Sequence, residues 1–336
     1  MPAGGRKVGS RNKDSRKILA ALPEFLSPSR RVTVRYCLYQ LVSRGLILST
    51  SDAHYSKLSS LLRAVRVSGE LDGAFAPDTL DDCFVDNHCK TETGGDDGWE
   101  NIAEYMEPSD PEHYRRNRWQ DQPKHVTEIW LEKDTTAVLV RPVVRKWDCT
   151  LRISAGAYGR AFLVKAANAL AEVEKPITIL CVGDFDPKGL DIERAAKEAN
   201  NQNKVGDDRR EGLFDILKTK HDWTAQRIQR QITWERVAAT HADLVRMEDK
   251  YKITAKQSGV DEVTGETTPG DSTAPAYVAQ YGELCLEVEA LEVVKVGELA
   301  ARLETAILKH GVNQAAWKRS EVKQKREIET WISSGG

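Results

Sequence analysis

The chain has 336 residues, of which 40% are hydrophobic and 30% are charged, and its formal net charge is -2. This composition is typical of a globular protein, the length allows two domains, and a fibrous protein is excluded. No stretch approaches the roughly 20 apolar residues that span a bilayer, and the N-terminus lacks the apolar core of a secretion signal, so we expect a cytoplasmic protein that does not contact a membrane.

Charge is distributed unevenly along the first third of the chain. Residues 1–35 carry nine Lys or Arg and only two acidic residues, which predicts a basic arm over residues 1–29. Between Glu70 and Glu112 there are fourteen acidic residues and a single lysine, so we interpret residues 91–124 as an acidic, solvated linker. Basic arms usually contact nucleic acid, although a merely solubilising tail has the same charge pattern.

Two amphipathic helices are predicted after the arm. The first begins near Val34, where apolar residues recur at helical spacing, and ends before Gly45. The second covers residues 53–68, ends at Gly69, and has a basic polar side that carries Lys57, Arg63 and Arg66. The following segment, Glu70–Phe75, is predicted to be a strand or wing. Residues 30–90 are therefore interpreted as a helix-turn-helix or winged-helix domain.

Strands and helices alternate beyond the acidic linker. The predicted strands cover residues 127–132, 151–154, 177–183 and 233–237, and the predicted helices between them cover 135–147 and 160–173. This order predicts an α/β domain with a mainly parallel sheet over residues 125–310, including a Gly- and Thr-rich loop at 258–275. The run 177–182 is nearly all apolar, as expected of a central strand that is covered on both faces. Residues 311–336 are predicted to form a C-terminal basic helix.

Three carboxylates follow two of these strands. Asp184 and Asp186 are two residues apart after the buried strand, so side-chain alternation points both to one side, and Glu132 ends another strand. Ligands of open α/β sheets bind at this edge, and a divalent cation would remove the repulsion between the carboxylates. Oxygen ligands favour Mg²⁺, with Mn²⁺ as an alternative. A helix that starts at Asp186-Pro187 would explain Asp186 as an N-cap, but not Asp184.

The spacing of these residues resembles that of a known domain. A strand ending in Glu132-Lys133, followed about 50 residues later by an apolar strand and Asp184-x-Asp186-Pro-x-Gly, resembles the Toprim domain of type II topoisomerases, primases and some nucleases. The glycine-containing turn at 153–159 resembles the strand-to-helix turn of that domain. With a helix-turn-helix domain before it, the chain is most similar to the topoisomerase VI A subunit and meiotic double-strand-break protein family, especially the short mini-A proteins of bacteria and viruses.

The resemblance also identifies a candidate nucleophile. The catalytic tyrosine of that family lies in a pattern similar to Thr-x-Arg-x-x-Tyr-Tyr, and this chain reads Thr33-Val-Arg35-Tyr36-Cys-Leu38-Tyr39, with leucine where an aromatic residue is usual. The match implies Tyr39 as the nucleophile. Tyr39 lies roughly 140° from the centre of the apolar stripe of its helix, but Tyr36 also faces away from it, so periodicity does not choose between them. A surface tyrosine without a catalytic role is the alternative.

The resemblance implies a tyrosine transesterase that acts on double-stranded DNA. Tyr39 would form a 5′-phosphotyrosyl link, Arg35 would stabilise the phenolate or the transition state, and Glu132 would carry a proton as well as bind metal. The residues expected to contact DNA phosphates are Lys57, Arg63, Arg66 and Lys133. In that family the tyrosine and the metal site come from different protomers, which implies a homodimer.

Other implications concern partners and alternatives. No glycine-rich phosphate loop occurs in the sequence, so ATP-driven strand passage would need a separate ATPase subunit. DNA as the substrate implies a nucleoid-associated location. Two other functions fit the same residues: a Toprim nuclease whose metal activates water while Tyr39 is incidental, or a DNA-binding component without catalysis.

Overall fold

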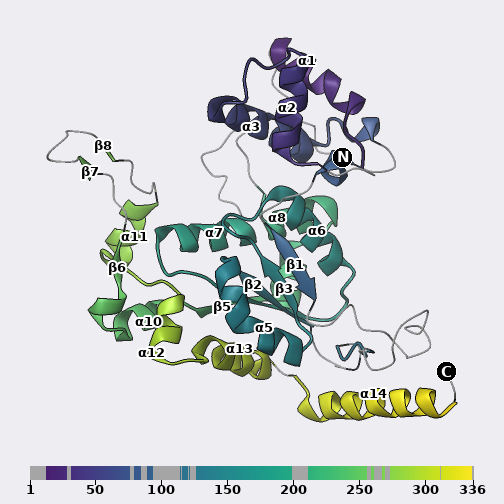
Figure 1. Cartoon of the computed structure of the whole chain (residues 1–336), viewed down its shortest axis with the longest axis vertical. Coiled ribbons are helices and arrows are strands. Elements are labelled where there is room, and N and C mark those ends of the chain that lie inside the picture. Colours follow the sequence, from purple (N-terminus) through teal and green to yellow (C-terminus); the bar gives the residue numbers. More distant parts are fainter. Residues whose placement is uncertain are drawn as a thin grey trace. The chain divides into compact units, whose positions relative to one another are not determined.

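The computed structural model describes residues 13–28, 32–75, 79–84, 89–93, 114, 116–119, 121, 126–198, 211–255, 259–260, 267–268, 273–310 and 312–334. These residues form a mixed α/β structure with a five-stranded, mostly parallel sheet, which confirms the predicted fold class (Figure 1). Most of the predicted acidic linker, and residues 1–12 and 29 of the predicted basic arm, lie outside the described residues.

The chain divides into two compact units. Unit 1 comprises Met1–His88, Tyr158–Ala169 and Arg194–Asp222, and unit 2 comprises Cys89–Ala157, Leu170–Glu193 and Trp223–Gly336. Two segments that sequence patterns assign to the α/β domain therefore belong to unit 1.

Unit 1 is built around short helices. They are α1 (Lys13–Ala21), α2 (Val34–Ser43), α3 (Asp52–Ser68), the first part of α6 (Arg160–Ala171) and α8 (Leu213–Lys220). Helix α2 begins where the Thr33 hydroxyl accepts a hydrogen bond from the Tyr36 N–H at 3.1 Å. Helix α3 ends at Gly69, which adopts a φ of 66° that glycine tolerates without strain. Both predicted helices are thus confirmed.

The predicted strand or wing at Glu70–Phe75 is wrong. Asp72–Ala74 form a 3-10 turn, η2, and the Asp72 carboxylate accepts a hydrogen bond from the Leu80 N–H at 3.1 Å. An Asp-Gly pair directly after a helix favours a turn, and a strand needs a partner to pair with. The described part of unit 1 offers only an isolated bridge between Val32 and Phe84. The described residues of this segment thus contain the two predicted helices but no wing strand, and the helix-turn-helix assignment stays a prediction.

A buried carboxylate connects three segments of unit 1. Asp81 lies in the turn η3 (Leu80–Cys83). Its carboxylate forms ion pairs with Arg66 Nε at 2.7 Å, Arg160 Nη2 at 3.2 Å and Lys220 Nζ at 2.8 Å. Arg160 also forms an ion pair with Glu211. These contacts join α3, α6 and α8, which are far apart in the sequence.

Unit 2 contains the sheet, with strand order β1-β3-β2-β4-β5. The strands are β1 (Lys90–Thr93), β2 (Val126–Leu131), β3 (Thr150–Ile153), β4 (Ile177–Val182) and β5 (Ile232–Ala238). Strands β2 to β5 are parallel to their neighbours, while β1 pairs with β3 in the antiparallel sense. The predicted strands β2 to β5 are therefore confirmed within one or two residues at each end.

Helices cover one face of this sheet with apolar side chains. The helices of unit 2 are α5 (Ala137–Lys146), α7 (Pro187–Lys197, through Glu193), α9 (Ala225–Gln231), α10 (His241–Arg246), α11 (Ala274–Tyr281), α12 (Glu289–Val294), α13 (Glu298–Lys309) and α14 (Gln314–Ser334). Helices α5 and α13 pack against each other and against the sheet, where Ile129 and Leu131 face the same core (Figure 1). Along β2 the alternate residues Glu128 and Trp130 point to the other face, where Glu128 forms a buried 2.7 Å ion pair with Arg152.

Smaller features complete unit 2. Strand β6 (Ile253–Thr254) pairs with β9 (Leu284–Cys285), and β7 (Gly259–Val260) pairs with β8 (Thr267–Thr268) inside the predicted loop. All six cysteines are free thiols. Among the helices of the described residues, none is both long and apolar enough to span a membrane.

The Asp81 network predicts a dependence of stability on pH. Burial by itself would raise the pKa of Asp81, but the positive charges of Arg66, Arg160 and Lys220 outweigh it and lower the pKa to about 2. Because the pKa is lower in the folded state, the stabilisation is complete above about pH 4 and is lost as the pH falls toward 2. We expect Asp81→Asn to lower the free energy of unfolding by about 3–5 kcal/mol at pH 6, since it leaves buried positive charges unpaired.

Urea unfolding of the full chain at pH 6 and pH 3 measures this effect. The difference between wild type and Asp81→Asn should shrink at pH 3. Glu248→Gln is a control, because Glu248 forms an ion pair with Lys250 in which both side chains are exposed, and it should change stability by less than about 0.5 kcal/mol. Equal stability of wild type and Asp81→Asn at pH 6 would contradict the prediction.

Candidate functional site

The ends of β2 and β4 place two of the predicted carboxylates next to each other. Leu131 pairs with Val182, and the ladder continues for one residue because the Glu132 N–H donates to the Val182 carbonyl at 3.1 Å. The Glu132 side chain then turns toward the chain that follows β4, where Oε2 accepts a hydrogen bond from the Asp184 N–H at 3.0 Å. The parallel register therefore brings Glu132 to Asp184 across 52 residues of sequence.

Two glycines make space for the Glu132 carboxylate. A Cβ atom at Gly183 would lie 2.7 Å from Glu132 Oε2, and a Cβ atom at Gly189 would lie 2.4 Å from the Asp184 carbonyl oxygen and 2.9 Å from Glu132 Oε2. These distances are shorter than any van der Waals contact, so a side chain at either position would displace the carboxylate or the backbone. The sequence shows both glycines, but their role as space for Glu132 needs the fold.

Asp184 is buried and uses both of its carboxylate oxygens. Oδ1 accepts the Val288 N–H at 3.0 Å, and Oδ2 lies 2.6 Å from the ammonium nitrogen of Lys133. Lys133 also lies 3.5 Å from Glu289 and 3.9 Å from Glu287. Lys133 was predicted as a DNA contact, and in the structure its ammonium group forms an ion pair with Asp184. Its positive charge stabilises a buried carboxylate that lies beside the negative charge of Glu132.

Asp186 has the helix-capping role that sequence analysis offered as an alternative. Helix α7 begins at Pro187, and Asp186 Oδ1 accepts the Gly189 N–H at 2.6 Å, which is the hydrogen bond of an N-cap. The residue between the two aspartates, Phe185, is held by backbone hydrogen bonds with Leu286 at 2.8 and 3.0 Å. The cap does not remove Asp186 from the cluster, because its charge still acts on Glu132.

The surroundings of Glu132 disfavour the ionised form of its carboxyl group. Burial and the negative charges of Asp184 and Asp186 raise the pKa of Glu132 to about 7, against smaller opposing effects of the Asp184 N–H and Lys133. Among the residues that the structure describes, no group of three or more His, Cys, Asp or Glu is already arranged around a metal position. The three oxygen-donor side chains and their excess negative charge nevertheless fit a hard divalent cation by donor chemistry and charge.

Arg236 supports the cluster from strand β5. Its Nη1 donates to the carbonyl oxygens of Gly183 at 3.0 Å, Asp184 at 3.1 Å and Ala239 at 2.8 Å, and its Nε pairs with Glu193 at 2.5 Å. These bonds fix the backbone that carries the aspartates. Arg236 was not among the predicted site residues, although it lies in a predicted strand.

The candidate nucleophile lies in unit 1. Tyr39 is on α2 with 57% of its surface exposed, whereas Tyr36 is half-buried and packs against the core of the unit. Leu38 is fully buried, which explains why an apolar residue stands where the family pattern has an aromatic one. Arg35 is exposed, and its guanidinium lies 4.4 Å from the centre of the Tyr55 ring. Exposure thus distinguishes Tyr39 from Tyr36, which periodicity did not.

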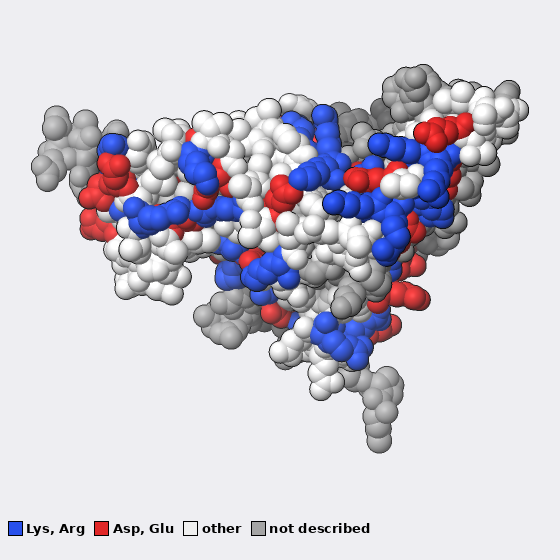
Figure 2. Space-filling view, turned by 90° about the horizontal axis from the view of Figure 1, so that it is seen from below, with Lys and Arg blue, Asp and Glu red and all other residues white. Residues whose placement is uncertain are grey.

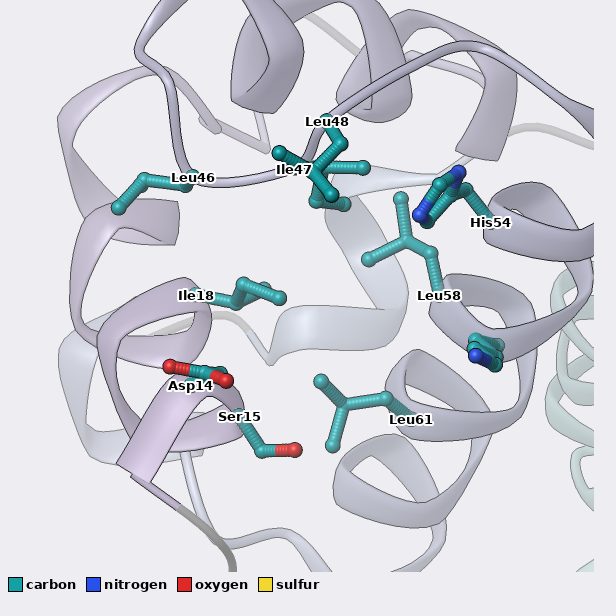
Figure 3. A pocket seen from close by; sticks show the side chains of 10 residues that line it. Asp14, Ser15, Ile18, Leu46, Ile47, Leu48, His54, Leu58 and Leu61 are labelled. Carbon is teal, nitrogen blue, oxygen red and sulfur yellow. The ribbon is translucent and has the colours of Figure 1, made fainter.

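The predicted DNA contacts of α3 differ in accessibility. Lys57 is exposed and Arg63 is half-buried, but Arg66 is 6% exposed and is bound to Asp81, so it does not belong to an accessible surface. Lys57 borders a pocket of about 320 Å³. Figure 3 shows that apolar side chains from Ile18, Leu46 and Leu58 enclose it, with His54 and Asp14 at its margin.

Comparisons with known proteins do not assign a family. A scan against protein-family models found no match, and a search of curated proteins found no significant relative. The Toprim and topoisomerase VI interpretation therefore depends on the residues and spacings given above, and on where the structure places them.

The raised pKa of Glu132 predicts that this carboxylate destabilises the fold at alkaline pH. Because its pKa is higher in the folded state than in the unfolded chain, stability is lost as the pH rises through about 7. At pH 8 without divalent cations, Glu132→Gln should be more stable than wild type by about 1–2 kcal/mol, and the difference should disappear at pH 5.

Urea unfolding in EDTA at the two pH values checks this expectation. Glu235→Gln is a control for which the expected change in stability at pH 8 has the opposite sign. Although burial opposes the shift, Lys309 and His310 lower the pKa of Glu235, so its substitution should decrease stability at pH 8. A Glu132→Gln variant that is less stable than wild type by the same amount at both pH values would refute the prediction.

Proposed function

We propose that this chain is a Mg²⁺-dependent DNA-cleaving protein of the topoisomerase VI A-subunit type, which breaks duplex DNA by tyrosine transesterification. The observation that carries the proposal is the charge-coupled cluster of Glu132, Asp184 and Asp186 at the carboxyl edge of a parallel sheet. A stable fold gains nothing from an ionised glutamate beside two aspartates, and such arrangements are typical of functional sites. The proposal also depends on the Toprim-like spacing of the three residues.

Glu132, Asp184 and Asp186 would hold Mg²⁺, or Mn²⁺ in its place, and the ion would position the scissile phosphate and neutralise its developing charge. The other residues of the cluster prepare this site. Lys133 forms an ion pair with the Asp184 carboxylate, while Arg236 holds the Gly183 and Asp184 carbonyl groups in place. Gly183 and Gly189 leave the space that the Glu132 carboxylate occupies.

Tyr39 would supply the nucleophile. Its exposed hydroxyl attacks the phosphorus, the Tyr39 oxygen–phosphorus bond forms, and the bond from phosphorus to the 3′ oxygen breaks. The phenolic proton passes to a base, for which Glu132 is the candidate, and the base returns this proton to the departing 3′ oxygen, which leaves as a hydroxyl group. The reverse reaction reseals the strand. Arg35 lies one turn before Tyr39 on α2, and its exposed guanidinium would stabilise the negative charge of the transition state.

The proposed reaction also requires that two copies of the chain assemble. Tyr39 and Arg35 belong to unit 1 and the carboxylates to unit 2. We propose a homodimer in which the tyrosine of one protomer acts with the metal site of its partner, on DNA in the cytoplasmic nucleoid. ATP-driven strand passage would require a separate ATPase subunit.

Covalent trapping tests the proposed reaction. Protein is incubated with 3′-end-labelled duplex DNA and Mg²⁺ and then denatured, and the label that stays on the protein is measured. Wild type and Tyr36→Phe should retain label, whereas Tyr39→Phe and Asp184→Asn should lose it by at least about 100-fold, since each removes a group that the reaction requires.

Each alternative function gives a different result. Nicking that survives Tyr39→Phe but not Asp184→Asn indicates a hydrolytic nuclease. Binding without cleavage in either metal indicates a non-catalytic DNA-binding component. Loss of label in Tyr36→Phe, with label retained in Tyr39→Phe, would identify Tyr36 rather than Tyr39 as the nucleophile.

Metal binding is tested separately by thermal unfolding. Mg²⁺ that binds only the folded state at 100 times its dissociation constant stabilises that state by about 2.7 kcal/mol, so the melting temperature should rise with Mg²⁺ concentration. Asp184→Asn should abolish this rise. Glu287→Gln, a substitution near Lys133 but outside the three proposed ligands, should retain it. A wild-type protein with no Mg²⁺-dependent shift would exclude the proposed metal site.

A further inference from the structure

The last helix of the chain is attached to unit 2 by one side only. Trp317 packs against Trp119 and Trp147, with ring centres 5.4 and 5.1 Å apart. One turn further, the Ser320 hydroxyl donates to Asp121 at 2.7 Å. Helix α14 is therefore held at its first half by buried aromatic and polar contacts, and the opposite side of the helix faces solvent.

Two of the three acidic residues of α14 lie on the attached side. Glu327 accepts the Tyr114 hydroxyl at 2.6 Å and pairs with Arg116 at 3.2 Å, while Glu321 lies 3.7 Å from Arg118. Both arginines have less than a tenth of their side chains exposed. Glu321 and Glu327 therefore contact positive groups within the protein, although the same arginines also pair with Asp148 and Asp121.

The basic residues lie on the solvent side. We define the α14 basic face as Lys318, Arg319, Lys325 and Arg326, which are all exposed. At 100° per residue these four positions fall within an arc of roughly 120°, which also contains Glu329. Among the described residues, none of the four forms an ion pair with a carboxylate. Figure 2 shows that blue side chains gather at the end of the displayed surface where α14 lies.

We propose that the α14 basic face binds the phosphate backbone of double-stranded DNA. From Lys318 to Lys325 the helix rises about 10 Å at 1.5 Å per residue, which corresponds to about three nucleotide steps of one DNA strand at 3.4 Å each. A cationic row of this length fits consecutive phosphates. The contact is independent of base sequence, because Lys and Arg reach phosphate oxygens rather than base edges.

Charge and polarity favour DNA over an anionic membrane. Helices that lie in a membrane interface bury a broad apolar face. On α14 the exposed apolar residues are Val322 and Ile332, three turns apart, while the other apolar side chains near Trp317 are already used inside unit 2. This inference rests on the part of the proposed function that concerns DNA binding, but not on DNA cleavage.

Fluorescence anisotropy with a short labelled duplex of mixed sequence tests the inference. The triple variant Lys318→Gln, Lys325→Gln, Arg326→Gln should bind at least about 10-fold more weakly at low salt, and its slope of log K against log salt should be less steep by about 2–3. Glutamine retains good helix propensity, and circular dichroism checks that α14 is intact.

A matched control removes the same number of charges elsewhere in unit 2. Lys146, Lys295 and Lys309 are exposed, but they pair with Glu304 at 2.5 Å, Glu298 at 2.9 Å and Glu235 at 2.9 Å. Their triple substitution by glutamine should change DNA affinity by less than about 3-fold, because these charges are already neutralised locally. A Lys-to-Arg version of the α14 substitutions, Lys318→Arg with Lys325→Arg, should bind like wild type.

The outcomes separate this inference from the proposed function. Equal weakening by both triple variants, or unchanged affinity of the α14 variant, overturns the inference while wild-type cleavage and trapping still support the proposed function. Binding to vesicles of phosphatidylserine that depends on the α14 basic face, with DNA affinity unchanged, also overturns it. Wild-type protein that does not bind duplex at all overturns both.

Discussion

The parallel register of β2 and β4 is the constraint on which the candidate site depends. Pairing of Leu131 with Val182 fixes where both strands end, and the next residues of each chain segment therefore meet at one edge. Glu132 and Asp184 are forced together by this geometry, although like charges repel. The fold compensates Asp184 with the Lys133 ammonium and the Val288 N–H, but it leaves Glu132 with a pKa of about 7.

The surroundings of the cluster keep this arrangement in place. Gly183 and Gly189 provide volume rather than unusual backbone angles, and Arg236 ties three carbonyl oxygens of neighbouring loops to one guanidinium. The uncompensated charge therefore sits in a rigid frame. Rigid support for a strained set of charges is what a metal-binding or catalytic site requires, because ligands that relax apart no longer favour the cation.

Elsewhere in the chain, buried charged groups pair with one another while other charged groups are exposed to solvent. In unit 1 the buried Asp81 forms ion pairs with the side chains of Arg66, Arg160 and Lys220. Tyr39 and Arg35 of the same unit are exposed. In unit 2, Glu321 and Glu327 of α14 lie on the side of the helix that is attached to the unit, and the α14 basic face lies on the solvent side. Ion pairs that stabilise the fold are thus separate from the exposed groups that are proposed to contact DNA.

The sequence determined helices α2, α3, α5, α6 and α14, strands β2 to β5 and the placement of the three carboxylates after strand ends, because periodicity, glycine stops and side-chain alternation are local properties of the backbone. It did not indicate strand β1, most of which lies where the acidic linker was predicted. The sequence did not determine which side chains contact each other in the folded chain. The predicted strand at Glu70–Phe75 is a turn, Arg66 is buried against Asp81, and Lys133 lies on Asp184. Glu321 and Glu327 of α14 form ion pairs with Arg118 and Arg116, about 200 residues earlier in the chain. Only the tertiary structure decided these contacts, since packing selects each partner from distant parts of the chain.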